Sequence, residues 1–113
     1  MNVDQLLSIA TDALDEVKGM DPVVLDVRGK CSVTDYLVIV SGTSNRHVKA
    51  LAEEVISQVK KAGAEVLGTE GGEVAEWVLV DLGDVVVHVM LPKTRDFYQL
   101  EKFWSADFSE EQA

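Results

Sequence analysis

The sequence has little of several residue types, and each shortage argues against a class of structure or partner. Cys31 is the only cysteine, so the chain can form no internal disulfide. No apolar run approaches the roughly 18 residues that a membrane-spanning helix needs. Ten basic residues stand against twenty acidic ones, and the net charge of −10 opposes binding to nucleic acid and to anionic membranes. A partner attracted by electrostatics should therefore be basic.

The N-terminal segment is acidic and lacks the basic, apolar pattern of a targeting peptide. Asp4, Asp12 and Asp15 precede any long apolar run. Together with the single cysteine, this predicts a cytosolic protein. The chain of 113 residues is long enough for one domain, which we expect to span residues 1–104. We expect the acidic residues 105–113 to form a disordered tail.

Three segments have apolar residues three and four positions apart and are predicted to be helices. Asn2 and Gln5 match the pattern of a capping box at the start of the first helix, and Gly19 is placed at its end. The other two predicted helices run from Ser44 or Asn45 to Gly63, and from a Thr94 cap through the aromatic residues up to Trp104.

Five runs rich in β-branched or aromatic residues are predicted to be strands, at residues 23–27, 36–40, 65–68, 77–82 and 85–90. Residues 69–76 are polar, contain two adjacent glycines and are predicted to form a loop. The elements follow one another in the order α-β-β-α-β-β-β-α. This order predicts an α/β fold with a single mixed five-stranded sheet that helices partly cover.

The last two predicted strands are joined by Gly83 and Asp84, a two-residue turn of the type II′ hairpin pattern. A turn of this length sets the register, and therefore determines which side chains share a face of the sheet. One face is wholly aliphatic, with Val78, Val80, Leu82, Val85, Val87 and Val89. We expect this face to pack under the helices.

The opposite face of the hairpin mixes large apolar groups with an acid and an imidazole. Burying the Asp81 carboxylate without a partner would cost roughly 1–3 kcal/mol, so this face is expected to stay accessible. Large apolar residues with a polar rim are typical of a protein interface. The predicted partner-binding residues are Trp77, Leu79, Asp81, His88 and Met90. The alternative is that the last helix, with Phe97, Phe103 and Trp104, covers them.

Candidate chemical sites are few, and the sequence predicts neither a metal site nor a cofactor. His47, His88 and Cys31 lie in separate predicted elements and show no paired motif. Residues 41–46 join a strand to a helix, so their N–H groups are a candidate anion site. The segment lacks the lysine of a phosphate-binding loop, and a capped turn explains it without a ligand. Asp84 is explained as a turn residue, whereas Asp81 has no comparable role in the sequence.

An ordered set of short motifs over most of the chain resembles the Iojap family of ribosome silencing factors. The resemblance runs from the first helix to Trp104 and depends on segments 25–27, 32–36, 41–44, 46–48, 70–71, 77–90 and 98–101. No single segment is specific, but the ordered set is. Cys31 and the tail after Trp104 fall outside the family pattern and have no assigned role.

The resemblance implies an α/β fold similar to the nucleotidyltransferase core, without transferase activity. It also implies docking on the fourteenth protein of the large ribosomal subunit, at the face where the small subunit joins. Blocking that contact would repress translation when nutrients are scarce. Homodimers are frequent in the family, and the same patch is a candidate for that contact. The rival interpretation is a nucleotide-binding or residual nucleotidyltransferase module that uses Gly42 to Arg46.

Overall fold

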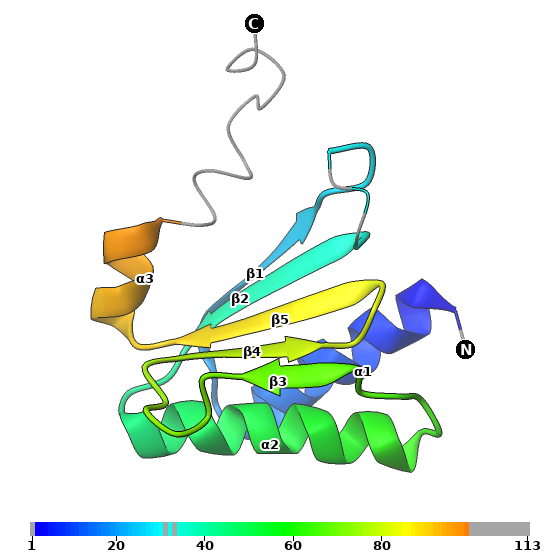
Figure 1. Cartoon of the computed structure of the whole chain (residues 1–113). Coiled ribbons are helices and arrows are strands. Elements are labelled where there is room, and N and C mark those ends of the chain that lie inside the picture. Colours follow the sequence, from blue (N-terminus) through cyan, green and yellow to red (C-terminus); the bar gives the residue numbers. More distant parts are fainter. Residues whose placement is uncertain (1, 31, 33, 100–113) are drawn as a thin grey trace, which may run out of the picture.

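The computed structural model describes residues 2–30, 32 and 34–99, which contain three helices and five strands. The helices are α1 (Val3–Glu16), α2 (Asn45–Lys61) and α3 (Pro92–Tyr98). The strands are β1 (Met20–Asp26), β2 (Tyr36–Ser41), β3 (Gly68–Glu70), β4 (Trp77–Asp81) and β5 (Val85–Met90) (Figure 1). The predicted order of elements is confirmed. Cys31, Phe103, Trp104 and the predicted tail lie outside the described residues.

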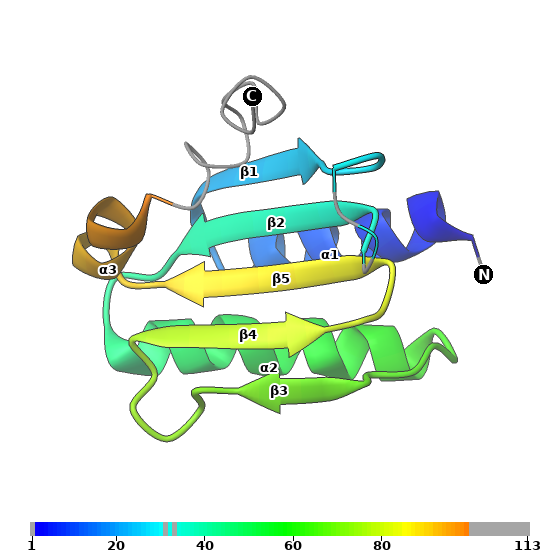
Figure 2. The same cartoon turned by 45° about the horizontal axis from the view of Figure 1, so that its top comes forward.

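All five strands form one sheet in the order β1-β2-β5-β4-β3 (Figure 2). β2 and β5 are parallel, and the other neighbouring pairs are antiparallel. The predicted single mixed sheet and α/β fold are therefore confirmed. The expected similarity to a nucleotidyltransferase core stays a prediction.

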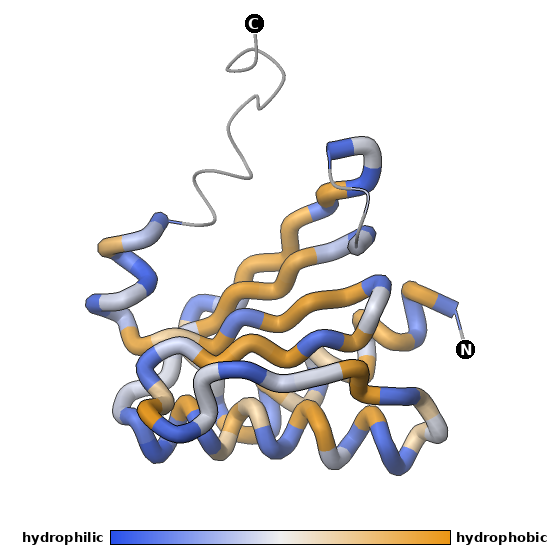
Figure 3. The backbone as a smooth tube through the Cα atoms, in the orientation of Figure 1, coloured by the Kyte–Doolittle hydropathy of each residue, from blue (hydrophilic) through white to orange (hydrophobic). Residues whose placement is uncertain are grey.

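The two long helices lie on the same side of the sheet, while α3 lies beyond the ends of β2 and β5 (Figure 2). Figure 3 shows hydrophobic residues along the central strands and an alternation of hydrophobic and hydrophilic residues along α2. The aliphatic face of the hairpin joins the core with α1 and α2, as predicted; its members are Val78, Val80, Leu82, Val85, Val87 and Val89. Burying this face leaves the other face of the sheet for a different role.

The ends of α1 show one correct prediction and one error. Asn2 Oδ1 accepts a hydrogen bond from the Gln5 N–H at 2.8 Å, and the Gln5 side chain accepts one from the Asn2 N–H at 3.0 Å, which confirms the capping box. The residue in the left-handed conformation after the helix is Lys18, at φ 61°, and not Gly19. A Cβ atom on Gly19 would lie 2.6 Å from Val40 Cγ2, so this glycine serves close packing between helix end and sheet.

The third strand lies further along the chain than predicted. Residues 65–68 were expected to form it, but β3 is Gly68–Glu70, and only Gly68 belongs to both. Gly68 pairs with Asp81 and Glu70 pairs with Leu79, and the Leu67 N–H donates to the Asp81 carbonyl at 2.8 Å. The position of β3 is therefore set by pairing with β4, and a local sequence pattern does not contain that information.

The last helix also begins earlier than predicted. α3 starts at Pro92, with Leu91 as an N-cap that makes no side-chain hydrogen bond, so Thr94 lies inside the helix and is not its cap. Proline suits the first helical position because its φ angle is already helical and its missing N–H is not needed there. Gln99 follows the helix in the left-handed conformation, at φ 49°.

Candidate partner-binding site

The face of the sheet opposite α1 and α2 carries all five residues that were predicted to bind a partner. The register places Trp77 beside Met90 and Leu79 beside His88, as the two-residue turn predicted. Their accessibility differs. Trp77, Leu79 and Asp81 are partly exposed, whereas His88 is 8% exposed and Met90 is completely buried. The expectation that Met90 and His88 belong to the accessible surface is therefore wrong.

α3 is anchored at the end of the face where Met90 lies. Met90 lies beside Ser41 of β2, which is itself 3% exposed. From α3, Arg95 Nη1 donates to Ser41 Oγ at 3.0 Å and lies 3.5 Å from the Met20 carbonyl oxygen. The last helix is thereby tied to the ends of β1 and β2. Trp77, Leu79 and Asp81 stay partly exposed. The alternative that the last helix covers the face stays a prediction, because Phe103 and Trp104 lie outside the described residues.

The His88 side chain accepts a hydrogen bond from the indole of Trp77. The Trp77 Nε1–H donates to His88 Nδ1 at 2.9 Å, and the two ring centroids are 5.9 Å apart. Since Nδ1 accepts a hydrogen bond, the neutral imidazole carries its proton on Nε2. Burial lowers the pKa of His88 from its ordinary value of 6.5 to about 4. This hydrogen bond fixes the orientation of the largest side chain on the face.

The lowered pKa of His88 predicts that the protein loses stability in mild acid. The unfolded chain takes up the His88 proton near pH 6.5, whereas the folded chain takes it up only near pH 4. The free energy of unfolding is therefore unaffected by this group above pH 6.5 and decreases as the pH falls from 6.5 toward 4. The decrease in the free energy of unfolding should reach at most about 3 kcal/mol. Urea unfolding of the wild type and of His88→Gln at several pH values measures it. Equal pH dependence of the two proteins would contradict this prediction.

Asp81 has a structural role that the sequence did not indicate. Its Oδ1 accepts a hydrogen bond from the Gly83 N–H at 2.9 Å, which closes the hairpin turn, while Gly83 adopts a φ of 91°. The side chain remains partly exposed. A carboxylate has room for further hydrogen-bond donors after accepting one, so Asp81 can stabilise the turn and still receive a cationic group from a partner.

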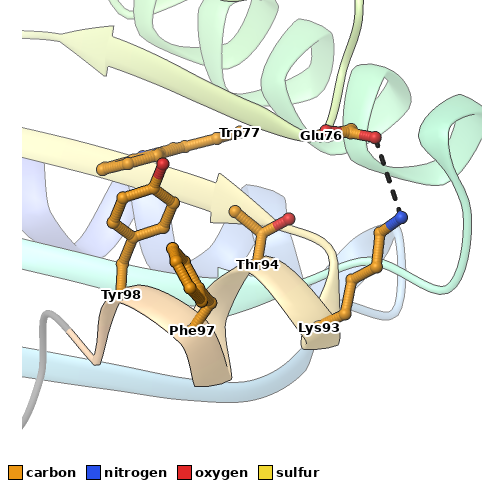
Figure 4. Close-up of a pocket in the computed structure, with 6 residues that line it drawn as sticks. All are labelled: Glu76, Trp77, Lys93, Thr94, Phe97 and Tyr98. Carbon is orange, nitrogen blue, oxygen red and sulfur yellow. Dashed lines mark ion pairs between the residues drawn. The ribbon is translucent and has the colours of Figure 1, made fainter.

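Aromatic residues of α3 extend the face beyond the hairpin. The Tyr98 ring lies 4.7 Å from the Trp77 ring and 5.0 Å from the Phe97 ring, measured between centroids. Phe97 is 79% exposed and Tyr98 is 52% exposed. A hollow of about 420 Å³ lies here, lined by Glu76, Trp77, Lys93, Thr94, Phe97 and Tyr98 (Figure 4). The Glu76–Lys93 ion pair at its rim spans 3.8 Å.

A second hollow, of about 310 Å³, lies against β3 and is lined by Glu70, Gly71, Trp77 and Leu79. Trp77 lines both hollows. Tryptophan is among the residues that most often contribute a large share of the binding energy at protein interfaces. We call the surface formed by Trp77, Leu79, Asp81, Phe97 and Tyr98 the contact face.

From the sequence, Phe97 was named only in the alternative in which the last helix covers the face, and Phe97 and Tyr98 were not identified as part of an accessible surface. The two adjacent aromatic residues were themselves a signal in the sequence that one of them stays exposed. Consecutive helical residues point about 100° apart, so two adjacent aromatic side chains cannot both lie flat on the sheet. In the structure Tyr98 contacts Trp77, while Phe97 points toward solvent as the most exposed large apolar residue described.

At the candidate anion site before α2, two of the N–H groups donate to the protein's own acceptors. The Thr43 N–H donates to His47 Nδ1 at 2.8 Å, and the His47 N–H donates to Ser44 Oγ at 3.1 Å. The Gly42 N–H donates to the Met90 carbonyl at 3.0 Å. His47 Nε2 then carries the proton and donates to the Val17 carbonyl at 2.7 Å. The structure favours the capped turn over a phosphate site, and the nucleotide-binding interpretation loses its main support.

The described part of the chain contains neither a metal-ligand cluster nor a membrane span. In that part, no three His, Cys, Asp or Glu side chains are grouped as metal ligands would be. Within the same residues, no helix has the length and apolar character to cross a membrane.

Comparison with known proteins identifies the family. The sequence model described as "Ribosomal silencing factor during starvation" matches residues 1–113. The ribosomal silencing factor of Haemophilus influenzae is 48% identical over 100 residues, which cover 88% of this chain and 98% of that protein. A mouse protein named for mitochondrial assembly of the large ribosomal subunit is 36% identical over 92% of this chain and 45% of its own length.

A solved structure agrees with the sequence comparison. The crystal structure of a Chromobacterium violaceum protein superimposes with a TM-score of 0.91 at 46% identity, covering 93% of this chain and 88% of that one. The family consists of silencing factors and not of enzymes. The resemblance predicted from the motifs is confirmed, and the chain belongs to the family of ribosomal silencing factors.

Proposed function

We propose that this chain docks through the contact face on the fourteenth protein of the large ribosomal subunit and sterically prevents the small subunit from joining. The observation that carries the proposal is the partly exposed Trp77, which lines two hollows on an accessible sheet face. This surface suits a protein partner better than a small substrate, because the lining of both hollows includes charged side chains.

Family and charge support the same partner. Membership among ribosomal silencing factors implies association with the ribosome, and the name of the mouse relative refers to the large subunit. The net charge of −10 opposes direct binding to ribosomal RNA, whereas it favours a basic ribosomal protein. Repression then needs no catalysis, since a bound protein of this size occupies the surface that the other subunit requires.

Sedimentation with purified subunits tests the proposal. We expect the protein to sediment with large subunits and not with small ones, and to reduce the amount of joined ribosomes when added before the small subunit. Binding to small subunits alone, or binding to large subunits without any effect on joining, would refute the mechanism. Heat of binding with magnesium nucleotides in calorimetry would instead revive the nucleotide-binding interpretation.

The charge of Asp81 should act on the rate of association. Asp81→Asn keeps an oxygen that can accept the Gly83 N–H but removes the negative charge. We expect several-fold slower association with large subunits at low salt, a weaker salt dependence and unchanged thermal stability, because charges at an interface steer the encounter. Stopped-flow or surface-binding kinetics at two salt concentrations measure the effect. An unaltered rate at low salt would place Asp81 outside the interface.

A further inference from the structure

The two edges of the sheet differ in how open they are to another strand. β1 contains Pro22, and its register with β2 shifts between Met20 and Val23. Proline and irregular pairing are features that block the addition of a strand. β3, at the opposite edge in Figure 2, has no proline, pairs with β4 without a shift and is exposed at all three residues. β3 is therefore the edge that another strand could extend.

Apolar groups surround β3. Leu67, just before the strand, is 60% exposed, and Val74, in the following loop, is 65% exposed. A hollow of about 140 Å³ lies between α2 and this edge, and its apolar lining includes Ala52, Ile56 and Val78. A strand that extends a sheet presents alternate side chains to each face, so this hollow is placed to receive one of them.

The charge around β3 selects the kind of strand that would bind. Glu65, Glu70 and Glu73 are exposed on or beside the strand, and Glu53 lines the hollow. Lys49 is the one basic residue in that lining. An extended segment rich in lysine or arginine complements this edge, whereas a second copy of this acidic chain would be repelled.

The edge is continuous with the contact face. Glu70 and Gly71 line the same hollow as Trp77 and Leu79. Glu70 also lies directly opposite Leu79 in the sheet, so their side chains share one face. A single partner can thus cover Trp77 and reach β3 without crossing another element.

We infer that β3 accepts an extended basic segment of the ribosomal partner, which pairs with it through main-chain hydrogen bonds and lengthens the sheet. The inference rests on the proposed function and adds the mode of recognition: side chains dock on the contact face, and backbone pairing occurs at the edge. The glutamates give specificity for a basic segment. The apolar hollow between α2 and β3 receives one side chain of that segment, on the α2 side of the sheet.

Hydrogen exchange of the full chain with and without purified large subunits tests this pairing. We expect exchange of those backbone amides within residues 68–70 that point away from β4 to slow at least tenfold on binding, because an added strand pairs with the outward-facing groups of an edge. If large subunits bind and these amides exchange as before, the edge pairing is refuted while the proposed docking stands. Failure to bind large subunits at all would overturn both.

Charge reversal gives a second measurement. Glu70→Lys with Glu73→Lys should weaken binding to large subunits at least tenfold at low salt. The matched control is Asp12→Lys with Asp15→Lys, which changes the net charge equally on α1, away from β3, and should alter binding less than threefold. Equal effects of the two pairs would show that only net charge matters, and would contradict a basic segment at β3.

Discussion

Replacing Trp77 with alanine should reduce the affinity for large ribosomal subunits by about 30- to 1000-fold, or about 2–4 kcal/mol. The change removes the indole that lines both hollows, the ring contact with Tyr98 and the hydrogen bond to His88. A buried or half-buried tryptophan at the centre of an interface typically carries a large share of the binding energy. Quantitative sedimentation or surface-binding titration measures the loss.

Two comparisons separate binding from folding in this experiment. Val24→Ala trims an apolar side chain that is 45% exposed on the far edge strand β1, and should change affinity less than twofold. Trp77→Phe keeps an aromatic ring but loses the indole N–H, and should have an intermediate effect. If Trp77→Ala is folded by circular dichroism and binds within threefold of the wild type, the contact face is wrongly placed.

Gly71→Ala should destabilise the protein by about 2–5 kcal/mol, although it adds only one methyl group. Gly71 adopts a φ of 84°, where an L-residue costs about 1–2 kcal/mol. The added Cβ would also overlap the carbonyl oxygen of Trp77, and moving that backbone costs about 1–3 kcal/mol more. Urea unfolding measures the loss. Because Trp77 must shift, binding to large subunits should weaken in the same variant.

The neighbouring glycine provides the control. A Cβ on Gly72 meets no atom within 4 Å, so Gly72→Ala should change stability by no more than about 0.5 kcal/mol. Equal stability of the two variants would show that the loop rearranges freely around residue 71. In that case the position of Trp77 would not depend on this turn.

Several features of this protein follow from the sequence alone because they depend on neighbours along the chain. The capping box needs only Asn2 and Gln5, which are three residues apart. The hairpin register needs only the length of the turn at Gly83, and the period of two in a strand then separates the aliphatic face from the mixed one. The same period is sufficient to place Trp77, Leu79 and Asp81 together on the mixed face.

Other features were decided only by tertiary structure, because they depend on groups that are distant in sequence. Met90 is buried at the end of the sheet where Arg95 anchors α3 to Ser41, and hydrophobic spacing cannot show that contact. β3 lies where β4 offers a partner, which moved it from the predicted position. The sequence thus determined which side chains share a face, and packing between layers decided which of them a partner can reach.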